Sequence, residues 1–235
     1  MKVNLGFRVI TEIQRPDREL VERFRGIPSS NINDIMNRMF CMGHELMPMN
    51  KAPLLGTAVT VKAPMGDNLA LTRAMDIAQA GDVIVVDGEG CEDRALMGEM
   101  MLTYCERKGI AGFVIDGAVR DSEAMRRSST PMYCRAVAPQ GPFKNGPGEI
   151  NVPIACGGQV VFPGDILVGD EDGIVVIRPK YAEELAEEAR KKHEKETAAL
   201  ARREEDAKSG ELFSKHEKKY AKMFEELGGQ YADRY

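Results

Sequence analysis

The sequence predicts an α/β protein whose parallel strands are covered by helices. Two short apolar runs, Val83–Val86 and Gly112–Ile115, are typical of strands that are buried on both faces of a sheet. A helical pattern over about residues 95–108 separates them and ends at Gly109. A strand, a helix and a second strand at this spacing indicate a crossover connection, so we expect the two strands to be parallel neighbours.

The elements before this unit are expected to be helices and one strand. A helix opens at Pro16–Glu19, where proline loses no hydrogen bond because the first N–H of a helix has no acceptor. Apolar residues at helical spacing predict a second helix over Asn31–Met39. The β-branched run over 54–61 predicts a strand. Gly66–Asn68 is expected to cap a helix that continues to Gln79.

The rest of the chain is rich in strands and turns and then becomes helical. A short helix is expected at about 121–127, and charged helical patterns cover 179–209 and 211–227. A helix of roughly 28 residues reaches about 42 Å, more than one domain needs, so we expect it to touch a neighbouring subunit. The predicted organisation is a catalytic core over residues 1–178, including the N-terminal helices, and a helical arm over 179–235. Strands are expected at 133–137, 150–156, 159–162, 166–168 and 174–177.

The composition excludes several classes of protein. Of 235 residues, 43% are hydrophobic and 29% are charged, which does not fit a disordered, collagen-like or membrane-spanning chain. Thirty-two basic against 37 acidic residues give a net charge of −5, so neither a nucleic-acid nor a membrane surface is expected. The five cysteines are odd in number and form no CxxC pair, so neither a disulfide framework nor a zinc knuckle is expected. Met1–Arg18 has no apolar signal segment. We therefore expect a cytoplasmic protein with reduced thiols.

Two loops that follow the buried strands carry the candidate site residues. The first, Asp87–Met101, is rich in glycine and acids and leads into a helix, and the second contains the pair Arg120–Asp121. Both are expected at the edge of the sheet where ligands of α/β proteins collect. There the guanidinium can hold a carboxylate with two hydrogen bonds, and the carboxylate can bind a hard divalent cation. The open alternatives are a flexible turn whose acids complement the helix dipole, and a surface pair in which Asp121 caps a helix.

A resemblance to a known family rests on four segments, Gly81–Asp87, Ala95–Glu99, Gly112–Asp121 and Pro163–Val175. Their order and spacing, over roughly residues 25–200, resemble those of the RraA-like family. The family contains the 4-hydroxy-4-methyl-2-oxoglutarate/4-carboxy-4-hydroxy-2-oxoadipate aldolases and the RraA regulators of ribonuclease activity; an older name is dimethylmenaquinone methyltransferase-like. The resemblance implies a phosphohistidine-domain-like α/β/β sandwich with helical N- and C-terminal arms, assembled as a homotrimer or a hexamer.

The resemblance also implies roles for residues of both loops. Arg120 is expected to bind the pyruvyl end of the substrate, and Asp121 to ligate Mg²⁺ or Mn²⁺. Glu99, at the start of the helix after the first loop, is expected to act in catalysis by orienting a water on the metal. Backbone N–H groups of Met100 and Met101 are expected to hold the substrate carboxylate.

Two further positions complete the implied site. Gly98 is expected to contact the substrate beside these amides. A glutamate on the long C-terminal helix of an adjacent subunit is expected to complete the outer shell of the metal, and Glu196 is the best match, with Glu194 close behind.

Two departures from the family concern the substrate: Ala124 stands where many active members carry an acid, and Arg94 stands where a small residue is expected. Arg94 is therefore a candidate for binding the distal carboxylate.

The implied function is a metal-dependent class II retro-aldolase that cleaves 4-hydroxy-2-oxo diacids to pyruvate and also decarboxylates oxaloacetate. A divalent cation that stabilises the pyruvate enolate makes a Schiff-base lysine unnecessary, and neither loop contains a lysine. The alternative is a non-catalytic RraA-type regulator that binds a ribonuclease or helicase partner. Retention of Arg120, Asp121 and Glu99 favours the enzyme. A methyltransferase is disfavoured because no glycine-rich cofactor loop follows a first strand.

Overall fold

The computed structural model describes residues 4–232, and these form a mixed α/β fold. Four parallel strands lie side by side in the order β3, β4, β5 and β6 at the centre of the main sheet. The crossover from β4 through α4 to β5 confirms the predicted parallel pair. Their bounds are β3 (Leu54–Lys62), β4 (Asp82–Met97), α4 (Glu99–Lys108), β5 (Gly112–Val119) and β6 (Met132–Val137).

Short strands complete the main sheet at its two sides. On the β6 side, β2 (Met47–Pro48) pairs antiparallel with β6. On the other side, β3 pairs antiparallel with both β7 (Gly148–Ile150) and β10 (Ile166–Asp170), and β1 (Phe7–Val9) pairs parallel with β7. From β10 the sheet continues into β11 (Gly173–Ile177), while β8 (Ile154–Cys156) and β9 (Gln159–Val161) form a separate hairpin.

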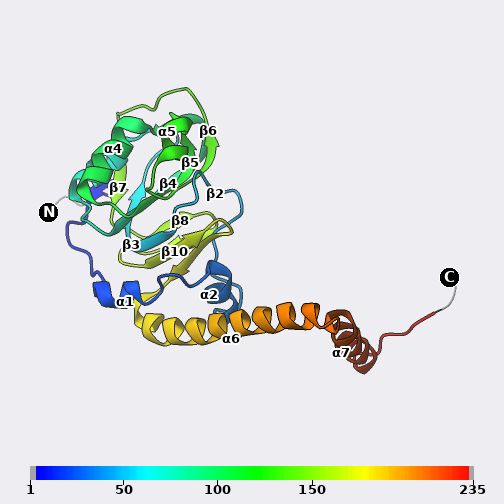
Figure 1. Ribbon diagram of the computed structural model, residues 1–235. Coiled ribbons are helices and arrows are strands. Elements are labelled where there is room, and N and C mark those ends of the chain that lie inside the picture. Colours follow the sequence, from blue (N-terminus) through cyan, green and yellow to red (C-terminus); the bar gives the residue numbers. More distant parts are fainter. Residues whose placement is uncertain (1–3, 233–235) are drawn as a thin grey trace. The chain divides into compact units, whose positions relative to one another are not determined.

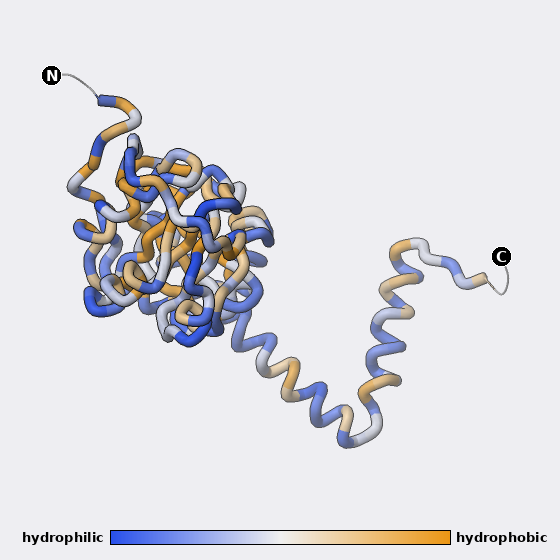
Figure 2. Tube along the Cα trace, turned by 90° about the horizontal axis from the view of Figure 1, so that it is seen from above, coloured by the Kyte–Doolittle hydropathy of each residue, from blue (hydrophilic) through white to orange (hydrophobic). Residues whose placement is uncertain are grey.

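The layers follow the predicted α/β/β sandwich (Figure 1). Helices α3 (Leu69–Ile77), α4 and α5 (Ser122–Arg127) cover one face of the parallel strands, and strands β8 to β11 cover the other. Side chains alternate between these two cores, because successive residues of a strand point to opposite faces. Ile84 packs under the helices, and Val83 and Val85 pack against the second β layer. Hydrophobic residues accordingly concentrate in the interior (Figure 2).

A third core lies on the outer side of β10 and β11. Helices α1 (Arg18–Glu22) and α2 (Ser29–Ile35) pack there with the first turns of α6 (Ala182–Lys208), which follow the short 3₁₀ helix Pro179–Tyr181. Ala182, Ala186 and Ala189 are buried in this core and allow close approach of the helix.

The chain divides into two compact units, residues 1–190 and 191–235. The division falls inside α6, whereas the boundary expected from the sequence, after residue 178, precedes that helix. Within its described residues, the second unit contains the rest of α6 and α7 (Leu212–Glu226), in which no residue is buried. The predicted pair of C-terminal helices is therefore confirmed.

The segment after Asp87 differs from its prediction. A loop and then a helix from about residue 95 were expected, but β4 continues to Met97 and α4 begins only at Glu99. The extension stays paired with β5 through three irregularities in register, and Glu89 and Gly90 adopt positive φ values of 55° and 67°. Pairing across the sheet outweighs the local helical pattern, because each irregularity inserts residues without breaking the ladder.

Backbone conformation also explains two shorter differences. The helix expected over 31–39 ends at Ile35, because Asn37 and Arg38 adopt left-handed conformations with φ of 57° and 61°. The strand expected over 150–156 is divided into β7 and β8 at Asn151, whose φ is 59°. Strands β1 and β2, of three and two residues, were not predicted, since such short segments show no periodicity.

Two further features concern the whole described chain. Across residues 4–232, no helix is both long and apolar enough to cross a lipid bilayer. All five cysteines lie in this range and are free, with Cys41 exposed and the other four buried.

Candidate active site

The two predicted loops meet at the carboxyl ends of β4 and β5. Met97 and Val119, the last residues of these strands, are paired in register, so the residues that follow them are neighbours in space. The Arg120 N–H donates to the Met97 carbonyl at 2.9 Å, which fixes the second loop to the first. Gly98 and Arg120 therefore stand side by side where α4 and α5 begin.

Asp121 occupies an unusual backbone conformation. It is the residue before α5 and adopts left-handed φ and ψ of 58° and 43°. Its side chain makes no capping hydrogen bond to α5; instead Oδ2 accepts the Glu99 N–H of α4 at 2.9 Å. The alternative of a side-chain cap is thus not what the structure shows. A non-glycine residue in this region costs about 1–3 kcal/mol, and such strain concentrates at functional sites.

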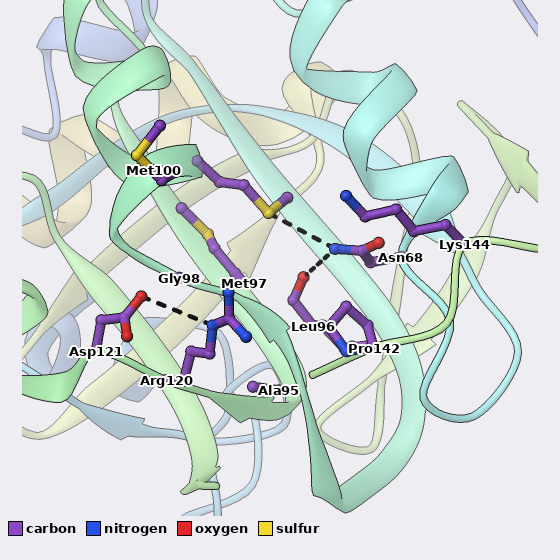
Figure 3. Close-up of a pocket in the computed structure, with 11 residues that line it drawn as sticks. Asn68, Ala95, Leu96, Met97, Gly98, Met100, Arg120, Asp121, Pro142 and Lys144 are labelled. Atoms are coloured by element: carbon purple, nitrogen blue, oxygen red, sulfur yellow. Dashed lines mark hydrogen bonds and ion pairs between the residues drawn. The ribbon is translucent and has the colours of Figure 1, made fainter. Parts of the chain in front are cut away.

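The Arg120 guanidinium lies beside this carboxylate. Its Nε is 3.8 Å from Asp121 Oδ2, and both side chains are about half-exposed (Figure 3). An exposed pair at this distance contributes little to stability. Because both side chains are about half-exposed, both charged groups are accessible to a ligand.

Gly98 makes this arrangement possible. A Cβ atom on Gly98 would lie 2.5 Å from Asp121 Oδ2 and 3.1 Å from Arg120 Nε. On another side, a Cβ on Gly141 would lie 3.2 Å from Arg120 Nη1. The guanidinium therefore occupies a narrow space that two glycines leave open.

A cavity of about 260 Å³ opens next to this pair. Five of the residues predicted for substrate or metal binding line it, namely Gly98, Met100, Met101, Arg120 and Asp121. The backbone of Met100 belongs to the first turn of α4, where N–H groups have no acceptor within the helix. The Met101 N–H donates to the Gly98 carbonyl at 3.1 Å. The other lining residues are Asn68, Ala95, Leu96, Met97, Pro142 and Lys144.

Neither of the two predicted glutamates lines the cavity. Glu99 is the first residue of α4; its backbone N–H binds Asp121, and the residue is exposed. Glu196 is on α6, in the second unit, where its Oε1 pairs with Lys192 Nζ at 2.8 Å. Its expected contribution to the site of an adjacent subunit stays a prediction.

Asn68 and Lys144 were not predicted from the sequence. Asn68 precedes α3 and is buried; its Nδ2 donates to the Leu96 carbonyl at 2.8 Å and contacts Met101 Sδ at 3.6 Å. Lys144 lies between β6 and β7, in a segment that the sequence presents only as a glycine- and proline-rich turn. A lone lysine inside such a turn was the one available signal.

Arg94 does not line the cavity. Its guanidinium carbon lies 4.1 Å from the centroid of the Phe143 ring, and Nη1 donates to the Gly141 carbonyl at 3.1 Å. Arg94 therefore supports the segment between β6 and β7, and the distal-carboxylate role suggested for it has no support in this geometry.

The donor set at the cavity suits a hard divalent cation. Asp121 offers one carboxylate. The Glu99 N–H binds its Oδ2, so this bond leaves Oδ1 for a cation. Among the described residues, no group of three or more His, Cys, Asp or Glu side chains gathers as a metal site. A structural zinc site needs such a group, whereas Mg²⁺ binds through one or two carboxylates and keeps several waters. The residues present therefore fit Mg²⁺ or Mn²⁺ completed by water and substrate.

The family model and the related sequences point to the same family. The model of the family described as RraA-like, Aldolase/RraA, matches residues 29–176. A protein of Halalkalibacterium halodurans, named provisionally as a 4-hydroxy-4-methyl-2-oxoglutarate aldolase, is 41% identical over 74% of this chain and 83% of its own length. The aldolase of that name from Thermus thermophilus is 37% identical over 47% of this chain and 68% of its own.

Solved structures agree with these relatives. Streptomyces coelicolor RraAS2, described as an unusual member of the RNase ES inhibitor RraA family, superposes with a TM-score of 0.72 at 28% identity, covering 80% of this chain and 99% of that one. The RNA-processing inhibitor RraA from Thermus thermophilus gives a TM-score of 0.59 at 30% identity, covering 63% and 91%. The family match, the relatives and the shared fold together show that this chain belongs to the RraA-like family.

Proposed function

We propose that the protein is a divalent-metal-dependent aldolase that cleaves 4-hydroxy-2-oxo acids to pyruvate and also decarboxylates oxaloacetate. The observation that carries this proposal is the placement of Arg120 and Asp121 around Gly98, at the mouth of a cavity and at the start of α4. The relatives named as aldolases support a lyase.

The substrate's 2-oxo acid end is assigned to Arg120 and to the start of α4. The guanidinium holds the carboxylate through charge-assisted hydrogen bonds, and the Met100 N–H adds a donor at the positive end of the helix dipole. This contact also orients the neighbouring 2-oxo group toward Asp121. The Asp121 carboxylate would hold Mg²⁺ or Mn²⁺, with Glu99 and the neighbouring subunit's Glu196 assigned to its outer shell.

Bond cleavage leaves a negative charge on the 2-oxo oxygen. A divalent cation, when bound, supplies the positive charge that stabilises this oxygen. The Glu99 carboxylate is assigned the 4-hydroxyl proton, which it accepts through water as the C–C bond breaks and returns to the methylene carbon of the product. Loss of CO₂ from oxaloacetate develops the same charge, so the two activities belong to one site.

A coupled assay tests the proposal. Pyruvate release is followed with lactate dehydrogenase across a panel of 2-oxo diacids, first with EDTA and then with Mg²⁺ added in excess of the chelator. We expect Mg²⁺ to restore turnover in the wild type and not in Asp121→Asn. The matched control is Asp172→Asn, which removes an exposed carboxylate in the turn between β10 and β11 and should behave as the wild type.

The alternative function is a regulator that binds a ribonuclease or helicase partner. The solved structures described as RraA proteins are compatible with it. It needs neither a cavity nor the pair at its mouth, so the geometry favours the enzyme. Absence of pyruvate release from every member of the panel, with folded protein and Mg²⁺ present, would favour the regulator.

A further inference from the structure

Helix α7 leaves an apolar face exposed. None of its residues is buried, and Phe213 and Leu227, at its two ends, are 82% and 78% exposed. An isolated helix of about 15 residues is marginally stable in water, and most helices in proteins are stabilised by the packing of an apolar face. The helical conformation of α7 therefore calls for a partner surface. The large apolar side chains exposed along it are Phe213, Tyr220, Met223, Phe224 and Leu227.

The spacing of this face is typical of a helix that packs along another helix. Phe213, Tyr220 and Leu227 recur every seven residues, and Met223 follows the second of them by three. Apolar residues at alternating intervals of three and four form the seam of a coiled coil. His216 takes the matching place three residues after Phe213, and its ring centroid lies 4.5 Å from that of Tyr220. The seam thus contains one polar position.

The charges of α7 argue against a membrane or a nucleic acid as the partner. The helix has four lysines and three glutamates, so its opposite charges nearly cancel. Anionic surfaces attract helices with a clear excess of positive charge. The partner surface is therefore expected to offer both signs of charge. The charged residues are Lys215, Lys218, Lys219 and Lys222, and Glu217, Glu225 and Glu226.

One edge of the apolar face carries a charge of each sign. Lys219 and Glu226 each precede a seam residue by one position, so they lie on the same side of the seam, two turns apart. Lys219 Nζ lies 5.1 Å from the centroid of the Tyr220 ring, and Glu226 Oε1 lies 3.6 Å from Lys222 Nζ. Two identical helices that pack antiparallel bring equal edges together. This edge can therefore complement itself.

The charges favour one arrangement of two α7 helices. In an antiparallel pair with Tyr220 against Met223 of the second copy, Lys219 lies beside Glu226 of the second copy, and symmetry repeats the contact. A shift by seven residues would instead place the two Lys219 side chains together. A parallel pair would place Lys219 beside Phe224 of the second copy. Because charges at these edges set the partner and the orientation of coiled coils, a second copy of this chain fits the face.

We propose that α7 is a self-association surface, through which two copies of this protein pair antiparallel with Lys219 of each beside Glu226 of the other. The inference does not rest on the proposed function. Helix α7 lies outside residues 29–176, which the family model matches, and contributes no residue to the cavity. Pairing through α7 doubles the mass of the particle that the rest of the chain forms.

The mass of the full-length protein in solution tests the association. Light scattering coupled to gel filtration, over a range of loading concentrations, should give the wild type twice the mass of Tyr220→Glu. Tyr220 contacts the second copy in two layers of the seam, so the variant places two charges in an apolar contact and should associate about 100-fold more weakly. A wild type that has the mass of Tyr220→Glu at every concentration would overturn the proposal.

The folded state of this variant can be checked separately. Tyr220 belongs to none of the three hydrophobic cores, so Tyr220→Glu should still unfold cooperatively on heating. His216→Leu provides a test in the opposite direction, because it removes the polar position of the seam. This variant should associate about tenfold more tightly than the wild type. Weaker association of His216→Leu would count against a seam at this face.

A reversal of charge tests the orientation. Lys219→Glu places like charges together at both symmetric contacts and should weaken association about tenfold. Adding Glu226→Lys restores opposite charges and should recover the wild-type association. Lys218→Glu makes the same change of charge on the opposite side of the helix and is the matched control. An equal loss in this control, or no recovery in the double variant, would overturn the antiparallel pairing.

Vesicles separate self-association from binding to a lipid surface. Sedimentation with phosphatidylserine vesicles should leave the wild type in the supernatant, because α7 lacks a clear excess of positive charge. Pelleting of the wild type but not of Tyr220→Glu, together with equal masses for the two proteins, would identify a membrane-binding helix and refute the pairing.

The enzymatic proposal fails or stands independently of these results. A doubled mass without pyruvate release would refute only the aldolase, whereas turnover with equal masses for the wild type and Tyr220→Glu would refute only the role of α7.

Discussion

Gly98→Ala perturbs the centre of the proposed site with a single methyl group. Gly98 has φ and ψ of −146° and −177°, an extended conformation that alanine adopts without strain. Any effect of the substitution on activity therefore arises from what the new Cβ contacts. The nearest atom is Asp121 Oδ2 at 2.5 Å, followed by Arg120 Nε at 3.1 Å.

The size of the effect follows from these distances. An ordinary contact begins at 3.4 Å, so Asp121 Oδ2 must move by 3.4 minus 2.5, or 0.9 Å. A misplacement of about 1 Å at a reacting site costs on the order of 10²-fold in rate, which corresponds to about 2.7 kcal/mol of transition-state stabilisation. We therefore expect kcat/KM for pyruvate release to fall about 100-fold.

The folded state should largely survive this change. Gly98 is the N-cap of α4, where alanine is less favourable than glycine by about 1 kcal/mol. That is a small part of the roughly 5–15 kcal/mol by which a native protein is stable, and it lowers the melting temperature by about 2–4 °C at this chain length. Thermal unfolding, monitored by circular dichroism, separates this loss from the loss of activity.

Gly141→Ala provides a graded comparison. Its Cβ would lie 3.2 Å from Arg120 Nη1, the far end of a flexible side chain, and requires a shift of only 3.4 minus 3.2, or 0.2 Å. We expect a much smaller loss of kcat/KM than for Gly98→Ala. If the folded Gly98→Ala protein keeps wild-type kcat/KM, the positions of Arg120 and Asp121 beside Gly98 do not determine the activity, and the reasoning is refuted.

Three further predictions follow from the same structure. Arg120→Lys should raise KM for the 2-oxo acid at least tenfold in the coupled assay, because an ammonium cannot make the two parallel bonds of a guanidinium; an unchanged KM would exclude that contact. Glu196→Gln should lower kcat at protein concentrations where the subunits associate, and wild-type kinetics there would count against a shared site. A thiol reagent at pH 8 should label Cys41 alone in seconds, because burial raises the pKa of Cys105 to about 12 and that of Cys134 to about 11; labelling of all five thiols at one rate would contradict the buried positions.

The central strands and the paired loops could be predicted from the sequence because their determinants are local. Continuous apolar runs such as Val83–Val86 indicate strands that are buried on both faces, and a helix between two of them leaves few topologies. Once the strands are parallel neighbours, the residues that follow them must meet at one edge. The proximity of Gly98 to Arg120 and Asp121 follows from this topology and is what the structure shows.

The remaining features depend on contacts between distant segments. The end of β4 at Met97 is set by pairing with β5, which no pattern within residues 88–97 reveals. Lys144 is brought to the cavity by bonds to the segment before α3, more than 70 residues earlier in the chain. Neither hydrophobic periodicity nor turn chemistry carries that information, so the sequence did not indicate that Lys144 lines the cavity.

The most direct test of the proposed metal-dependent activity is to locate the cation. Crystals grown with Mn²⁺ and pyruvate can be measured at the manganese absorption edge, where anomalous scattering identifies the ion independently of the rest of the density. We expect a peak bonded to the Asp121 carboxylate and to pyruvate, with the pyruvate carboxylate on the Arg120 guanidinium. A peak away from Asp121, or pyruvate bound without any peak at this edge of the sheet, would contradict it.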